Sequence, residues 1–172
     1  MLAAHTRAEI ERARDRYPQP RSAILPSLWA VQHELGWLPP EGMAEVAEIL
    51  GLAPSEVQAV STFYSMYFQR PQGRHHILVC INAACALRGA DETVAYLERR
   101  LACPSGSTTA DGMFTWESTI ECLGGCGGAP MMQIDHRFEE NLTPERIEEI
   151  LTRAAAEPSD HHGAPPAGGA AG

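Results

Sequence analysis

The chain has 172 residues, of which 44% are hydrophobic and 20% are charged, as is ordinary for a soluble protein with one medium domain or two small ones. This composition excludes a fibrous or a disordered protein. The formal net charge of -9 leaves no basic face for phosphate groups, so we expect no nucleic acid partner and expect other proteins as partners.

The N-terminal segment predicts where the chain resides. No apolar stretch approaches the roughly 20 residues that span a bilayer, so no direct membrane insertion is expected. Residues 1–18 lack the apolar core of a signal peptide, and their acidic residues Glu9, Glu11 and Asp15 are unlike a mitochondrial presequence. We therefore interpret the start as a mature cytoplasmic N-terminus.

Residues 1–72 predict an N-terminal helical bundle. The expected helices cover residues 6–16, residues 22–35, the segment around residues 43–50, and a segment that begins near residue 54. Ser22 is the expected cap of the second helix, while Gly36 and Gly51 are expected to end the second and third in the left-handed conformation. Pro54 suits the first turn of the fourth helix, because that turn does not need its missing N–H.

An aromatic segment and a joint follow this bundle. Residues 62–68 are aromatic and extended in character, and they fit core packing, interdomain packing or contact with a partner. Residues 71–73, Pro-Gln-Gly, are typical of a joint between two units.

Residues 73–156 have a different pattern. Strands are expected over residues 77–81, 114–121 and 131–134, and helices over residues 91–101 and from residue 144. Thr143 caps the last helix and Pro144 occupies its first position. The order β-α-β-β-α predicts an α+β protein whose C-terminal domain is a thioredoxin-like α/β layer of one sheet covered by helices.

The last residues, 157–172, form a Pro/Gly/Ala tail. From Pro158 onward, 11 of the 15 residues are Pro, Gly or Ala. Such a composition does not repay the entropy of ordering, so we expect a mobile tail without chemistry.

Four of the five cysteines form two short pairs at the ends of predicted strands. Cys80 and Cys85 enclose a loop of small residues, whereas Cys122 and Cys126 lie in a loop that carries four glycines. The cysteine count is odd and nothing indicates secretion, so metal or redox use of these thiols is favoured over a disulfide framework. Four thiolates from two loops suit one soft metal centre.

Three kinds of chemistry are compatible with this cysteine pattern. A 2Fe-2S cluster needs four thiolates, two for each iron, and a structural zinc ion also accepts four cysteines. Thiol chemistry is the least favoured, because the C-x-x-C redox spacing is absent. The glycines of residues 124–128 favour the cluster, since they let the backbone approach it and direct N–H groups at its sulfides.

The other candidate residues have simpler explanations. Cys103 has no cysteine near it in sequence, so we expect a packed side chain outside the site. His75 and His76 are expected to precede a strand and, with His161 and His162, to be solvated, which argues against a mixed His/Cys centre. Neither a dinucleotide-binding motif nor a phosphate-binding loop occurs, so NADH is not expected to bind this chain directly.

Several motifs, in order along residues 17–156, resemble a known family. They are residues 60–66 (VSTFYSM), Cys80 to Cys85 followed by residues 87–91 (LRGAD), residues 109–112 (TADG), residues 121–130 (ECLGGCGGAP) and residues 141–145 (NLTPE). The chain resembles the small thioredoxin-like 2Fe-2S subunit of the NADH dehydrogenase module of respiratory complex I, a family shared with the diaphorase subunits of NAD-linked hydrogenases and formate dehydrogenases.

This resemblance implies a helical bundle, a thioredoxin-like domain and one 2Fe-2S cluster on Cys80, Cys85, Cys122 and Cys126. It implies an electron-transfer subunit of an NADH:quinone oxidoreductase, whose partner flavoprotein binds NADH and FMN and passes single electrons to the cluster. A larger iron-sulfur subunit is the second implied partner. The implied location is cytoplasmic, peripheral on the inner face of the bacterial plasma membrane within a complex. The same subunit of a soluble formate dehydrogenase or hydrogenase, or a zinc-stapled interaction module, is the alternative.

Overall fold

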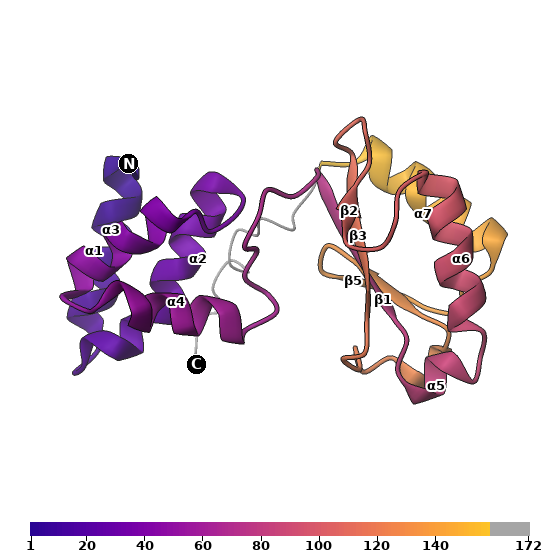
Figure 1. The fold of residues 1–172 in the computed structure, drawn as a ribbon, viewed down its shortest axis with the longest axis horizontal. Coiled ribbons are helices and arrows are strands. Elements are labelled where there is room, and N and C mark those ends of the chain that lie inside the picture. Colours follow the sequence, from indigo (N-terminus) through magenta and orange to yellow (C-terminus); the bar gives the residue numbers. More distant parts are fainter. Residues whose placement is uncertain (159–172) are drawn as a thin grey trace, which may run out of the picture. The chain divides into compact units, whose positions relative to one another are not determined.

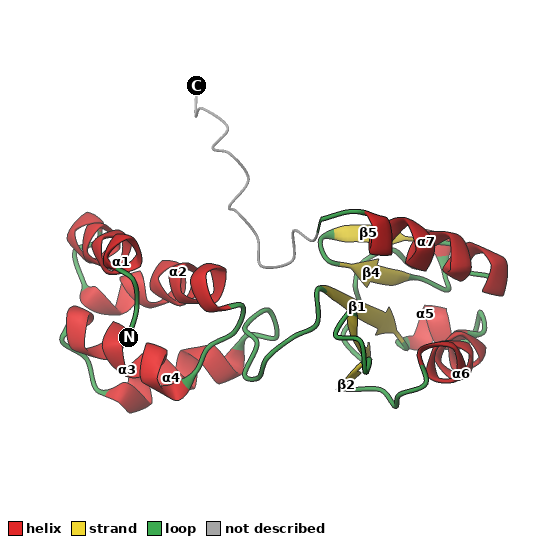
Figure 2. Ribbon diagram, turned by 90° about the horizontal axis from the view of Figure 1, so that it is seen from above, coloured by secondary structure: helices red, strands yellow, loops and turns green. Residues whose placement is uncertain are grey.

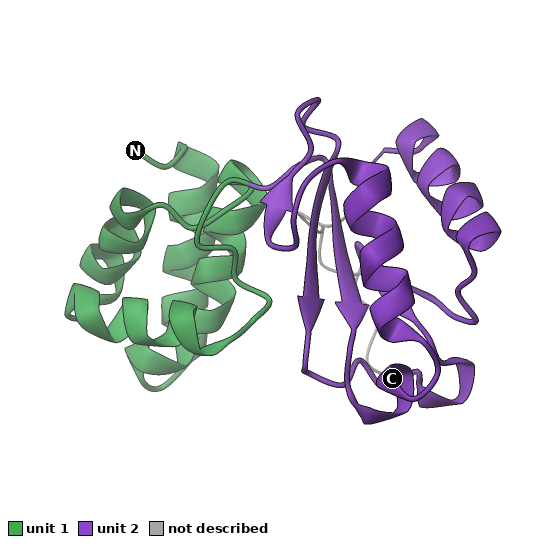
Figure 3. Ribbon diagram, turned by 45° about the vertical axis from the view of Figure 1, so that its right-hand side comes forward, with its two compact units in different colours: residues 1–71, 162–172 green, residues 72–161 purple. Residues whose placement is uncertain are grey.

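The computed structural model describes residues 1–158, which are coloured along the chain in Figure 1. They divide between Pro71 and Gln72 into two compact units, coloured separately in Figure 3. The expected mobile tail falls almost entirely on residues 159–172, and with His161 and His162 it lies outside the described residues.

The first unit is helical, as Figure 2 shows. Its elements are α1 (Ala4–Arg16), the short 3-10 helix η1 (Pro20–Ala23), α2 (Ile24–Leu35), α3 (Pro40–Leu50) and α4 (Pro54–Phe63). As predicted, Gly36 and Gly51 end α2 and α3 in the left-handed conformation, with φ of 77° and 67°. Leu28, Val31 and Val46 are fully buried at the centre of this unit.

Two local predictions in this unit are wrong. Ser22 does not cap α2, because it lies inside η1 and α2 begins at Ile24 with Ala23 as its cap. Residues 62–68 are not extended throughout, since α4 continues to Phe63. The rest of this segment is held by Gln32, a buried side chain of α2 that donates to the Met66 carbonyl and accepts from the Phe68 N–H.

The second unit is a five-stranded mixed sheet with three helices. The elements are β1 (His75–Cys80), α5 (Ala83–Ala86), α6 (Ala90–Leu101), β2 (Ser107–Thr108), β3 (Phe114–Thr119), the 3-10 turn η2 (Cys126–Gly128), β4 (Met132–Ile134), β5 (Arg137–Glu139) and α7 (Pro144–Ala156). The strand order is β2-β3-β1-β4-β5. In this sheet β1 and β3 pair in parallel. The other three pairs, β1 with β4, β4 with β5, and β2 with β3, are antiparallel. This is the α+β, thioredoxin-like arrangement that the sequence predicts.

Helices α6 and α7 cover the same face of this sheet (Figures 1 and 3). Ile77, Trp116 and Ile134, from the three central strands, are fully buried in the core beneath them. Thr143 caps α7 through its side chain, which accepts the Arg146 N–H, and Pro144 is its first residue. The apolar face of the sheet and the apolar stripes of the two helices therefore share one core.

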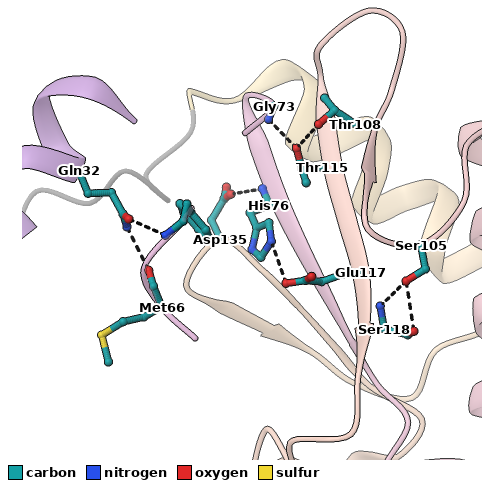
Figure 4. Close-up of polar contacts among 11 residues, drawn as sticks. Gln32, Met66, Gly73, His76, Ser105, Thr108, Thr115, Glu117, Ser118 and Asp135 are labelled. Atoms are coloured by element: carbon teal, nitrogen blue, oxygen red, sulfur yellow. Dashed lines mark hydrogen bonds and ion pairs between the residues drawn. The ribbon is translucent and has the colours of Figure 1, made fainter. Parts of the chain in front are cut away.

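The prediction of solvated histidines is wrong for His75 and His76. Both lie within β1 rather than before it, and both are buried. The Nδ1 atom of His75 lies 2.8 Å from the Oδ2 atom of Asp135, and the other carboxylate oxygen of Asp135 accepts the His76 N–H. Figure 4 shows the second bond, together with the contact between His76 and Glu117. A carboxylate distant in sequence lets these polar residues be buried.

Four elements of the second unit were not predicted. They are α5, β2, η2 and β5, none longer than four residues. Elements this short do not show a hydrophobic period in the sequence. In none of the described residues is there a helix long and apolar enough to cross a membrane.

Candidate metal centre

The two cysteine loops meet because of how the strands pair. Cys80 is the last residue of β1, and its partner in the parallel register is Thr119, the last residue of β3. After β1 the chain enters α5, which carries Cys85. After β3 it enters the loop that carries Cys122 and Cys126. Parallel neighbours end at the same edge of a sheet, so both pairs of cysteines are brought to that edge.

The four cysteine thiols lie near one another and influence one another's pKa. The thiols of Cys85 and Cys122 are both near enough to Cys80 to lower the pKa of its thiol. The sulfur atoms of Cys122 and Cys126 lie 3.4 Å apart. All four side chains are free thiols, with Cys80 and Cys85 buried and Cys122 and Cys126 exposed. One side of the group is therefore enclosed by protein, and the other side is open to solvent.

Cys80 is the sulfur at which negative charge is best stabilised. Burial by itself raises the pKa of this thiol, but the backbone N–H groups of Leu123 and Asn82 and the two neighbouring thiols lower it below its usual value. Burial and the charge on Cys80 raise the pKa of Cys85, although the backbone of Met131 opposes this. The hydrogen bond to Cys122 raises the pKa of Cys126.

Asn82 joins the two loops, and the sequence reasoning missed it. Its side-chain oxygen accepts the Ala83 N–H at 2.8 Å and so caps α5. Its side-chain nitrogen donates to the Ile120 carbonyl at 2.6 Å, just before the second pair of cysteines. Asparagine is among the preferred cap residues, so its place before a short helix was a usable signal.

The glycines of the second loop leave space for the side chain of Glu140, which follows β5. A Cβ atom on Gly125 would lie 2.9 Å from Cε of Met131 and 3.1 Å from Oε1 of Glu140, and one on Gly128 would overlap the Glu140 side chain. Gly127 has open space at this position. Gly124 has φ of 92°, a conformation that glycine adopts without strain.

We expect Gly128→Ala to destabilise the second unit by about 1–3 kcal/mol, because the added methyl group must displace Glu140 from its Cβ atom outward. Gly127→Ala is the matched control, and its free energy of unfolding should change by less than about 0.5 kcal/mol. Urea unfolding of both variants measures the difference. Equal stability of the two variants would contradict this packing.

The remaining sequence candidates lie away from these sulfurs. Cys103 is partly buried against the sheet core, and its carbonyl accepts the indole N–H of Trp116 at 3.1 Å. His75 and His76 begin β1, whereas Cys80 ends it. Within residues 1–158, no group of three or more His, Cys, Asp or Glu side chains is arranged to hold a single metal ion.

The donor set of this edge fits a 2Fe-2S cluster. Such a cluster takes four cysteine sulfurs, and two pairs can serve its two irons. Backbone N–H groups already point at the sulfurs of Cys80 and Cys85, as hydrogen bonds that stabilise an iron-sulfur centre do. The exposed sulfurs of the second pair leave an open side.

Comparison with known proteins gives the family. The model of the thioredoxin-like [2Fe-2S] ferredoxin family matches residues 10–155. The chain belongs to this family.

Relatives of this 2Fe-2S ferredoxin include subunits of NADH-quinone oxidoreductases. The chain is 43% identical over 145 residues to one such subunit from Rhizobium meliloti (strain 1021), and the match covers 84% of this chain and 86% of the relative. It is 41% identical over 152 residues to the corresponding subunit from Escherichia coli (strain K12), where the match covers 88% and 91%.

A solved structure shares the fold. The chain superposes on an NAD+-reducing [NiFe]-hydrogenase in the H2-reduced state with a TM-score of 0.64 and 26% identity. The match covers 76% of this chain but only 22% of the hydrogenase chain, so it concerns one part of that larger protein.

Proposed function

We propose that this 2Fe-2S ferredoxin is an electron-transfer subunit of an NADH:quinone oxidoreductase and holds one cluster through Cys80, Cys85, Cys122 and Cys126. When bound, the cluster supplies a centre that exchanges one electron at a time, as is needed beside an FMN that receives two electrons from NADH. The observation that carries the proposal is the gathering of four free thiols at one sheet edge.

The residues of the site have separate roles in this proposal. Cys80 and Cys85 provide the buried anchor, and the N–H groups of Asn82 and Leu123 stabilise charge on Cys80. Cys122 and Cys126 complete the set from the surface, where a partner protein can approach. Asn82 keeps the two loops at a fixed separation.

The partners and the location follow the same reasoning. We infer that the FMN- and NADH-binding flavoprotein delivers the electrons and that a larger iron-sulfur subunit belongs to the same complex, because the relatives are subunits of NADH-quinone oxidoreductases. The complex then holds this chain on the cytoplasmic face of the bacterial plasma membrane. We also propose that residues 1–72 and 73–156 are its two domains, in line with the division beside Pro71.

Cluster content and partner identity test this function. Anaerobically purified protein should be red-brown, contain iron and acid-labile sulfide in the ratio of one 2Fe-2S cluster per chain, and give a paramagnetic resonance signal when reduced. Affinity purification of the tagged chain from its own cells should recover a flavoprotein that contains FMN and oxidises NADH.

Three outcomes would contradict the proposal. Colourless protein with one zinc ion per chain would support a zinc-stapled module. Reduction of insulin disulfides by metal-free protein would support a thiol oxidoreductase. Recovery of a hydrogenase or a formate dehydrogenase with the chain would change the parent enzyme but keep the cluster.

A further inference from the structure

Glu140 lies against the loop that carries Cys126. Its carboxylate is next to the Cα atoms of Gly125 and Gly128, where any larger residue would collide with it. Two backbone hydrogen bonds hold this segment in place, from the Asn141 N–H to the Gly128 carbonyl at 2.6 Å and from the Leu142 N–H to the Pro130 carbonyl at 3.0 Å. The position of the carboxylate is therefore set by backbone pairing and by the two glycines.

The preceding residue shows by contrast what is unusual about Glu140. Glu139 is buried, and both Arg146 and Arg153 form ion pairs with it. Glu140 is exposed, and among residues 1–158 no lysine or arginine forms an ion pair with it. The Glu139 carboxylate is thus paired with two arginines, whereas the Glu140 carboxylate lies beside the cysteine loop without an ion pair among residues 1–158.

We propose that the Glu140 carboxylate lowers the reduction potential of the cluster, so that the site releases its electron more readily; this rests on the proposed function. Four thiolates already make the site anionic, and reduction adds one more negative charge. A carboxylate held against Gly125 and Gly128, in the loop that carries Cys126, repels that added charge. Gly125 and Gly128 are part of this arrangement, because their lack of a side chain leaves room for the carboxylate against the loop.

The size of the effect follows from solvent exposure. Water and salt screen an exposed charge, so one carboxylate changes the equilibrium constant of reduction only modestly. We expect Glu140→Gln to raise that constant about threefold to tenfold, and a tenfold rise corresponds to ~59 mV for one electron. Glu140→Lys, which reverses the charge, should shift the potential further in the same direction, and Glu140→Asp should leave it near the wild-type value.

The test is an anaerobic redox titration of the purified full chain, followed by paramagnetic resonance. Glu98→Gln is the matched control, because it removes one exposed negative charge from α6, an element of the same unit, and should not move the potential. Iron and sulfide content and the shape of the resonance signal are measured for every variant, which separates a change of charge from a change of structure.

The outcomes distinguish this inference from the proposed function. A wild-type chain without a cluster would overturn the proposed function. Full cluster content in Glu140→Gln with an unchanged potential would overturn the role of Glu140 alone. An equal shift in Glu98→Gln would also overturn it, because total charge would then account for the change. A raised potential in Glu140→Gln and Glu140→Lys, but in neither Glu140→Asp nor Glu98→Gln, would support it.

Discussion

Cys85→Ala and Cys126→Ala should each abolish the bound iron and sulfide, whereas Cys103→Ala should retain both. The two substitutions take one sulfur from each pair, and three thiolates do not complete the four-cysteine ligand set of a 2Fe-2S cluster. Cys103 lies apart, with its backbone bound to Trp116. The measurements are iron and sulfide per chain and the visible absorption of the reconstituted protein.

Stability should follow the same pattern. Metal binding is linked to folding, so the cluster-free variants should lose several kcal/mol of the free energy of unfolding in the second unit relative to the loaded protein. The first unit shares no cysteine with the site and should keep its helical circular dichroism. A full complement of iron in Cys85→Ala or in Cys126→Ala would overturn the proposed ligand set.

Asp135→Ala should lower the free energy of unfolding by about 3 kcal/mol, the cost of leaving a buried hydrogen-bonded network without its central group. Both side chains of the pair, His75 and Asp135, are fully buried. The carboxylate also accepts the His76 N–H at 3.0 Å. Since Nε2 of His75 is buried without a hydrogen bond, the ring has no second hydrogen bond to compensate for the loss.

Two variants isolate the effect of burial on this loss. Asp135→Asn keeps the shape of the side chain and one acceptor oxygen. Asparagine also tolerates the positive φ of 53° at this position, so this variant should lose clearly less free energy of unfolding than Asp135→Ala. Asp111 also accepts two hydrogen bonds, from Thr109 and Met113, but is exposed, and Asp111→Ala should lose about 1 kcal/mol or less. Urea unfolding compares all three.

Cluster content provides a second check on the same variants. Asp135 pairs with the start of β1, whereas Cys80 ends that strand, so Asp135→Ala should bind iron normally below its unfolding midpoint. Equal urea midpoints for Asp135→Ala and the wild type would contradict the stabilising role of the pair.

The features that the sequence predicted well are those governed by neighbouring residues. Glycines 36 and 51 end helices because only glycine adopts the left-handed conformation without strain, and Thr143 with Pro144 starts α7 because the first turn needs an acceptor but no N–H. The strand ends at Cys80 and near Cys122 were visible as changes in hydrophobic pattern. These signals act within a few residues and need no knowledge of the fold.

The predictions that were wrong depended on distant residues. A histidine in a strand is usually solvated, and only Asp135, 60 residues away from His75, makes burial favourable. Ser22 has the chemistry of a cap, but packing of the bundle places it inside η1. The strands β2 and β5 exist because β3 and β4 supply hydrogen-bond partners, since segments of two or three residues have no stability of their own.

Spacing and local conformational preference were enough to predict the class of the protein, the order of most of its helices and strands, and the four thiols that suit a metal centre. The folded arrangement was needed to reveal that backbone N–H groups from both loops lower the pKa of Cys80, that Asn82 joins those loops, and that Glu140 lies against Gly125 and Gly128. Each of these contacts joins segments far apart in the chain, so each depends on the strand register and on the packing of the whole sheet.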